Sequence, residues 1–231
     1  MAEQTVIQYL VWHIQDKNSN ARISLVMDYT PNARNDRTER TYDVFTLKHF
    51  TRFLNELRLD RVFILDPHSS VTTALLNRVH VDESYLASLI TQAITCVEEH
   101  TEPGSCVVYY PDNGAAKRLS KLIDYRYIRG DKERDWETGE ILGTQVLDVT
   151  ADGLEGNTVL IVDDICSYGG TFIQAAEALK KLGVAHIYLY VTHCENSVLQ
   201  GNLLTSGLID GVFTTRSIFT GEHPLITILE G

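Results

Sequence analysis

The sequence predicts an α/β protein built from two lobes of parallel sheet, each flanked by helices. The chain has 231 residues, of which 44% are hydrophobic and 22% are charged, so it can bury a sizeable core. Segments with helical spacing alternate with short apolar segments, and this order favours parallel strands joined by crossover helices. Apolar segments also end repeatedly at an aspartate, at positions 28, 66 and 112. We place the junction between the lobes near Asp82, which gives lobes of residues 1–82 and 83–231.

The first lobe is predicted to contain two helices and two strands. Residues 4–13 carry apolar side chains at positions 6, 7, 10 and 11, the spacing of a helix with one buried face. Residues 22–27 are apolar and β-branched and lead to Pro31, which predicts a strand followed by a loop. Helical spacing returns over residues 44–57, and a second strand is predicted over residues 61–65.

The second lobe repeats the alternation. Its predicted helices cover residues 83–99, 115–123 and 172–182, and its predicted strands cover residues 105–110, 157–162 and 186–191, with an edge strand over residues 144–150. The stretch 126–140 is charged and shows no clear period, so we expect an exposed, mobile loop there.

Composition excludes several classes of protein. The formal net charge of -11 repels nucleic-acid backbones, and the apolar runs are far shorter than the ~20 residues that a membrane span needs. The first residues show no secretory signal, so we expect a cytoplasmic protein with no membrane or nucleic-acid partner. The four cysteines lack metal-site spacing and are interpreted as reduced, buried thiols.

The most specific pattern lies at residues 159–171. Four apolar residues of a buried strand are followed by Asp163 and Asp164, and the sequence Gly169-Gly170-Thr171 then opens a helix. Glycines at a helix N-terminus let an anion approach backbone N–H groups, and adjacent carboxylates suit hydroxyl donors. A sugar phosphate satisfies both requirements. The alternative is a plain helix cap beside solvated acids.

This segment resembles the phosphoribosyl pyrophosphate motif shared by type I phosphoribosyltransferases and ribose-phosphate pyrophosphokinases. The pyrophosphokinases are further indicated by four matches in the same chain order. These are Met27–Arg37, similar to their ATP loop; Asp60–His68, similar to their metal-site strand; Tyr110–Gly114, similar to their S-P-D-x-G turn; and Asp131–Arg134, similar to their catalytic loop. The resemblance extends over about residues 6 to 218 and implies a type I phosphoribosyltransferase-like fold.

The resemblance implies transfer of the β,γ-diphosphoryl group of Mg-ATP to the anomeric hydroxyl of a ribose 5-phosphate moiety, with release of AMP. It makes the first lobe the ATP lobe and the second the phosphoribosyl lobe. The residues implied to bind ATP are Arg34, Asn35, Asp36, Arg37 and His68. Those implied to bind the ribose phosphate are Asp163, Asp164, Ser167, Tyr168, Gly169, Gly170 and Thr171. Lys132 and Arg134 are implied to be catalytic, because their positive charge can neutralise the negative charge on the diphosphoryl group in the transition state.

Magnesium is the implied metal, with His68 and Asp112 at its site. Both residues follow strands, so we expect them to meet at one sheet edge. Magnesium prefers oxygen ligands, and contact of His68 with a phosphate or a metal-bound water is the alternative.

The chain departs from the family pattern in three places. No counterpart of the family's opening strand and hairpin precedes Gln4, and no terminal helix follows Leu229, so we expect a version shortened at both ends with a different adenine pocket. Tyr168 stands where the family has a small hydroxyl donor. Because an aromatic ring can stack on a base, ADP-ribose is a second candidate acceptor, as in phage relatives that rebuild NAD.

Two other functions stay open from the sequence. A catalytically silent regulatory relative could keep the sugar-phosphate loop without ATP chemistry, and a type I phosphoribosyltransferase needs only the second lobe. Retention of Arg34, His68 and Lys132 favours an active pyrophosphokinase. We expect it to work as a homo-oligomer on small-molecule substrates.

Overall fold

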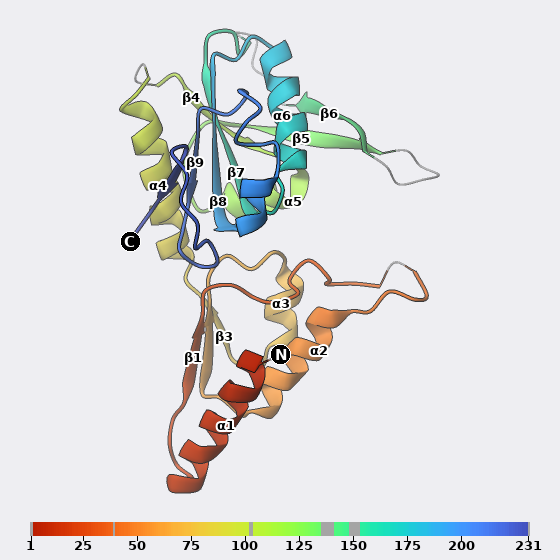
Figure 1. Ribbon diagram of the computed structural model, residues 1–231, viewed down its shortest axis with the longest axis vertical. Helices are drawn as coiled ribbons and strands as arrows, with labels where there is room; N and C mark the ends of the chain where they lie inside the picture. The colour runs from red at the N-terminus through yellow and green to blue at the C-terminus, as the bar shows by residue number, and fades with distance from the viewer. Residues whose placement is uncertain (1, 39, 102–103, 135–140, 148–152, 231) are drawn as a thin grey trace. The chain divides into compact units, whose positions relative to one another are not determined.

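The chain forms two compact units, Met1–Asp82 and Glu83–Gly231. The computed structural model describes residues 2–38, 40–101, 104–134, 141–147 and 153–230 (Figure 1). Over this part of the chain no helix is both long and apolar enough to cross a membrane.

The first unit is a three-stranded parallel sheet with helices packed on it. Its strands are β1 (Ser24–Met27), β2 (Arg61–Ile64) and β3 (Val79–Val81), in the order β1-β2-β3. Its helices are α1 (Ala2–Lys17), α2 (Thr46–Glu56) and α3 (Ser70–Leu75). Helix α2 buries Leu47, Phe50, Thr51 and Leu54, which share one face of the helix. Phe50 and Leu54 belong to the hydrophobic core that includes Val62 and Ile64 of β2.

The second unit is built on a seven-stranded sheet. In sheet order its strands are β10 (Ile226–Ile228), β9 (Gly211–Thr214), β8 (His186–Cys194), β7 (Thr158–Cys166), β4 (Cys106–Tyr110), β5 (Tyr127–Arg134) and β6 (Ile141–Leu147). All neighbours are parallel except β5 and β6. Its helices are α4 (Glu83–Glu98), α5 (Asn113–Leu119) and α6 (Gly170–Lys181), with a 3-10 turn, η1 (Asn196–Gln200). In Figure 1, α4 lies on one side of this sheet and α5 and α6 on the other.

The centre of the second sheet is the core of that unit. Val159, Leu160, Ile161 and Val162 on β7 are fully buried, because helices cover both faces of the sheet. Such a rigid centre fixes the backbone from which the turn after β7 leaves the sheet. The α/β architecture predicted from the sequence is therefore confirmed, with an antiparallel edge strand added.

The prediction of a loop over residues 126–140 is wrong for residues 127–134. These residues form β5, which pairs in parallel with β4 and antiparallel with β6. Two neighbouring strands satisfy its backbone N–H and C=O groups, so the charged sequence does not prevent a strand. Residues 135–140 lie outside the described residues.

Several predicted boundaries also shift. Strand β7 continues to Cys166 instead of ending at Val162, and α5 covers Asn113–Leu119 instead of residues 115–123. The edge strand β6 starts at Ile141, and residues 148–150 of the predicted strand lie outside the described residues. The short elements α3, β3, β9 and β10 carry too few residues for a periodic signal, and sequence reasoning did not assign them.

Candidate functional site

The turn between β7 and α6 has the backbone of an anion-binding loop. Gly169 is the residue before α6, has a φ of 84°, and offers no side chain to cap the helix. A Cβ added to Gly169 would lie 2.7 Å from the Cβ of Leu203, so position 169 requires glycine for its conformation and for its space. The first N–H groups of α6 point out of the helix start, where they can hydrogen-bond to an anion.

The segment after η1 packs against the same turn. A Cβ added to Gly201, just after η1, would overlap the backbone oxygen of Tyr168. The turn therefore packs tightly on the chain that follows β8. Ser167 and Thr171 are half-buried, whereas the Tyr168 side chain is 59% exposed.

Asp163 and Asp164 lie inside β7, not after it as the sequence predicts. Their side chains are 18% and 5% exposed. Burial raises the pKa of Asp163 well above its ordinary value, and the Asp164 carboxylate raises it further. The backbone N–H of Asp164 donates to Asp163 Oδ1 over 2.9 Å and works in the opposite direction.

Arg118 on α5 is the cation that faces these two carboxylates. Its Nη2 donates to Asp164 Oδ1 over 3.2 Å and lies 3.9 Å from Asp163 Oδ1. Sequence reasoning missed Arg118. The feature of the sequence that could have indicated Arg118 is its position in the helix directly after Pro111-Asp112. That helix, α5, packs against β7.

Asp112 caps the helix that carries Arg118. Its Oδ1 accepts hydrogen bonds from the N–H groups of Gly114 (2.9 Å) and Ala115 (3.0 Å). Because β4 and β7 are parallel neighbours, with Tyr109 opposite Ile161, Asp112 follows its strand at the same sheet edge as the turn after β7. The structure thus brings Asp112 and the predicted ribose-phosphate residues together.

The β5–β6 pair continues past this edge. Tyr110, the last residue of β4, pairs with Arg129, and β5 then runs on to Arg134. Lys132 pairs with Thr144 on β6, so the backbone of the predicted catalytic segment lies on a two-stranded ribbon at this same edge. A Cβ on Gly130 would overlap the Tyr109 hydroxyl, which explains the glycine two residues before Lys132.

The predicted ATP residues lie in the first unit, at the carboxyl ends of β1 and β2. Arg34, Asn35 and Arg37 are exposed, and Arg37 Nε lies 3.9 Å from Asp36 Oδ1. Ser69 Oγ donates to Asp36 Oδ2 over 2.6 Å. This bond joins the loop after β1 to the loop after β2.

Ser69 also fixes the chain beside His68. Its Oγ accepts from the N–H of Val71 over 3.3 Å and so caps α3, and His68 is half-buried immediately before it. Sequence reasoning missed Ser69, although serine is a common residue at the start of a helix. Through the bond from Ser69 to Asp36, the loop of residues 34–37 is connected to the loop that carries His68.

The expectation that His68 and Asp112 meet at one sheet edge is wrong. His68 follows β2 of the three-stranded sheet, and Asp112 follows β4 of the seven-stranded sheet. The predicted junction near Asp82 already places the two residues in different lobes, and because each unit has its own sheet, their strand ends do not share one edge. Within the described ranges no three His, Cys, Asp or Glu side chains gather as a metal site.

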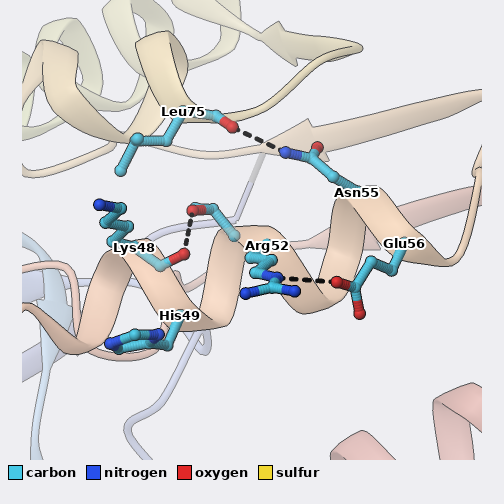
Figure 2. A pocket seen from close by; sticks show the side chains of 7 residues that line it. Lys48, His49, Arg52, Asn55, Glu56 and Leu75 are labelled. Carbon is cyan, nitrogen blue, oxygen red and sulfur yellow. Dashed lines mark hydrogen bonds and ion pairs between the residues drawn. The ribbon is translucent and has the colours of Figure 1, made fainter.

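A pocket of about 510 Å³ in the first unit contains none of the predicted site residues. Figure 2 shows it against α2 and the end of α3. Its basic side chains are partly engaged, since Arg52 Nε bonds Glu56 Oε1 over 2.8 Å. Asn55 Nδ2 donates to the Leu75 oxygen over 2.8 Å and ties the two helices together. We assign it no role.

Comparison with known proteins shows which proteins this chain is similar to. The model of the phosphoribosyl transferase domain matches residues 111–207, which include Asp112, Lys132 and the turn after β7. Ribose-phosphate pyrophosphokinase of Agrobacterium fabrum is 31% identical over 180 residues, covering 77% of this chain and 55% of the relative. That of Bradyrhizobium diazoefficiens is 31% identical over 208 residues, covering 87% of this chain and 62% of the relative. The chain is therefore similar to ribose-phosphate pyrophosphokinases over most of its own length, and part of its second unit matches a phosphoribosyl transferase domain.

A solved structure supports the fold. Phosphoribosylpyrophosphate synthetase from Mycobacterium smegmatis matches with a TM-score of 0.73 at 19% identity, covering 98% of this chain and 72% of that one. The chain spans 55% and 62% of the length of the two pyrophosphokinases compared above. The predicted ATP residues lie outside the range of the domain model.

Proposed function

We propose that this pyrophosphokinase relative transfers the β,γ-diphosphoryl group of Mg-ATP to the anomeric hydroxyl of a ribose 5-phosphate moiety and releases AMP. The observation that carries the proposal is the turn after β7. A glycine cradle at a helix start and two carboxylates lie within one short segment, and the strand that leads to it is fully buried.

The second unit supplies the sugar site in this proposal. The segment Ser167–Thr171 binds the 5-phosphate through the N–H groups at the start of α6 and through the hydroxyls of Ser167 and Thr171. Asp163 and Asp164 accept hydrogen bonds from the ribose hydroxyls, and these bonds place C1 for reaction. Burial of the rigid sheet beneath them keeps the acceptor in a fixed orientation.

The first unit supplies the ATP site. Arg34 and Arg37 are exposed guanidinium groups, and such groups bind phosphate oxygens in pairs. Magnesium would be held by phosphate oxygens of ATP together with one or two carboxylates, which is how proteins usually bind this ion, and it would neutralise phosphate charge there. Asp112 fits as an oxygen donor near the sugar site, although its Oδ1 already caps α5. His68 fits better as a partner of a phosphate or a metal-bound water.

The chemical step is an in-line attack by the C1 hydroxyl oxygen on the β-phosphorus. The bond to the α-phosphate oxygen breaks, AMP leaves, and the proton of the hydroxyl goes to solvent or to a phosphate oxygen. Lys132 and Arg134 on β5 stabilise the charge that spreads over the moving group.

One observation favours ADP-ribose as a second candidate acceptor. The Tyr168 ring is 59% exposed beside a turn that otherwise consists of glycines and small hydroxyl residues. An exposed ring can stack on the adenine of a ribose 5-phosphate that is already esterified to a nucleotide. With ribose 5-phosphate, by contrast, the ring has no base to contact.

The proposal is tested by measuring AMP formed from Mg-ATP with ribose 5-phosphate, with ADP-ribose and with no acceptor. AMP that depends on one acceptor supports the proposal and names that acceptor. A Tyr168→Ser variant then separates the two readings, because it should weaken use of ADP-ribose and spare ribose 5-phosphate.

Two outcomes contradict the proposal. Binding of acceptor without AMP formation indicates a silent regulatory relative. Consumption of phosphoribosyl pyrophosphate with a base indicates a phosphoribosyltransferase. Light scattering of the same preparation tests the expected homo-oligomer.

A further inference from the structure

Arg118 makes a contact that the proposed chemistry does not explain by itself. Its Nη2 lies 3.2 Å from Asp164 Oδ1 and 3.9 Å from Asp163 Oδ1, and its side chain is only 21% exposed. One guanidinium therefore faces both carboxylates that are expected to bind the ribose. Arg118 comes from α5, which packs against β4, β5 and β7.

The position of Arg118 is fixed from the start of its helix. Asp112 caps α5 with two hydrogen bonds from its Oδ1, and Ala115, Ala116 and Leu119 anchor the helix in the core. The cation is thus held by packing and does not depend on a flexible loop. Its charge and its direction are both set before any ligand arrives.

The two carboxylates need such a partner. Burial and mutual repulsion raise the pKa of Asp163, and only an ionised carboxylate is an acceptor at both oxygens. The groups that face Asp163 are Asp164 and Cys166 on β7 and Arg118 from α5. The backbone N–H of Asp164 and the guanidinium of Arg118 both favour the ionised form of Asp163, and Arg118 is the cation among these groups.

We propose that Arg118 is a positioning residue that keeps Asp163 and Asp164 ionised and oriented to receive two ribose hydroxyls. The proposal rests on the proposed function for the identity of the ligand, but not for the effect on the carboxylates. An arginine suits the role because its planar fork presents several N–H donors at once, whereas lysine offers a point charge. Lysine should therefore preserve ionisation better than orientation.

The first test uses the ligand-free protein and ¹³C NMR titration of the aspartate carboxyl groups. In Arg118→Met we expect the Asp163 and Asp164 carboxyl groups to titrate at higher pH than in the wild type, and Arg118→Lys should restore most of the difference. Lys117→Met is the matched control, because Lys117 is the exposed neighbour on the same helix. In this control variant the two aspartate carboxyl groups should titrate as they do in the wild type.

The second test measures binding of ribose 5-phosphate by calorimetry between pH 5 and 8. We expect Arg118→Met to weaken binding by about tenfold or more, with the loss largest at acid pH, and Arg118→Lys to recover it in part. The ligand's own phosphate titration cancels when each variant is compared with the wild type at the same pH.

The outcomes separate this proposal from the proposed function. Unchanged carboxyl titration in Arg118→Met overturns the proposal even if the wild type forms AMP. A loss of affinity that is equal at every pH and accompanied by a lower Tm also overturns it, because that result marks a purely structural role. Absence of ribose 5-phosphate binding by the wild type removes the assigned ligand, while the NMR titration still decides the ionisation effect.

Discussion

At the scale of single residues, the site contains a conflict between stability and function. Asp163 is largely buried next to another carboxylate, and its pKa is raised well above its ordinary value of 3.8. The folded protein therefore holds a proton there at pH values where the unfolded chain has lost it. Its contribution to stability is largest below pH 3.8 and falls as the pH rises through the raised pKa.

Replacing Asp163 by asparagine should consequently stabilise the protein and abolish its use of ribose 5-phosphate. The amide keeps an oxygen for the N–H of Asp164 but carries no charge to bury. Thermal unfolding should show a higher Tm than the wild type at pH 8 and a much smaller difference at pH 4. A lower Tm at pH 8 would show that the charge of Asp163 is stabilising.

A second residue-scale prediction concerns Gly169. Alanine there would have to adopt a φ of 84° and would place its Cβ 2.7 Å from Leu203. We expect a loss of stability of about 1–3 kcal/mol from the backbone strain and a larger loss of sugar-phosphate affinity. For stability, Gly170→Ala is the matched control, because a Cβ at Gly170 meets no protein atom within 4 Å. Equal losses of stability in the two variants would show that Gly169 is not strained by a side chain.

At the scale of elements, sequence patterns predicted the long helices and buried strands well. Apolar spacing located α2 and α4, and the unbroken apolar run located the start of β7. The pattern failed at β5, whose strand state comes from pairing with β4 and β6 and not from its own side chains. Arg118 and Ser69 were missed because their places in the sequence do not reveal their partners, which lie 46 and 33 residues away along the chain.

Asp112 has a structural role in α5 that can be separated from any role with Mg-ATP. Asp112→Ala removes the cap and should cost about 1 kcal/mol of stability, whereas Asp112→Asn keeps a good capping residue. Both variants should lose turnover if the negative charge is used in the reaction. Chemical denaturation and AMP formation, measured together, check this; full turnover of Asp112→Asn would restrict Asp112 to capping.

Lys132 lies on the ribbon of β5 and β6, and its predicted role is to stabilise the transition state. Lys132→Ala should lower turnover by ~10³-fold or more with little change in Tm. Lys121→Ala, at an exposed lysine after α5, is the control and should retain activity. Near-normal turnover of Lys132→Ala would remove this residue from the mechanism.

At the scale of the whole molecule, the predicted site residues divide between two units. The residues expected to bind ATP lie in Met1–Asp82, and those expected to bind the sugar phosphate lie in Glu83–Gly231. The sequence showed both groups because each resembles a family motif. The predicted division near Asp82 already placed His68 and Asp112 in different lobes, and the structure assigns them to different sheets. The sequence could not show the order of strands within each sheet, because that order is set by contacts between distant segments.

The proposed reaction transfers the β- and γ-phosphates of ATP together to the C1 hydroxyl oxygen of the acceptor. The direct measurement uses ATP carrying ³²P at the β-position with ribose 5-phosphate or ADP-ribose, followed by separation of the products. The account predicts acceptor-dependent AMP, with the label in a diphosphate ester of the sugar. Label that stays in ATP, or appears in ADP or free phosphate irrespective of the acceptor, would contradict it.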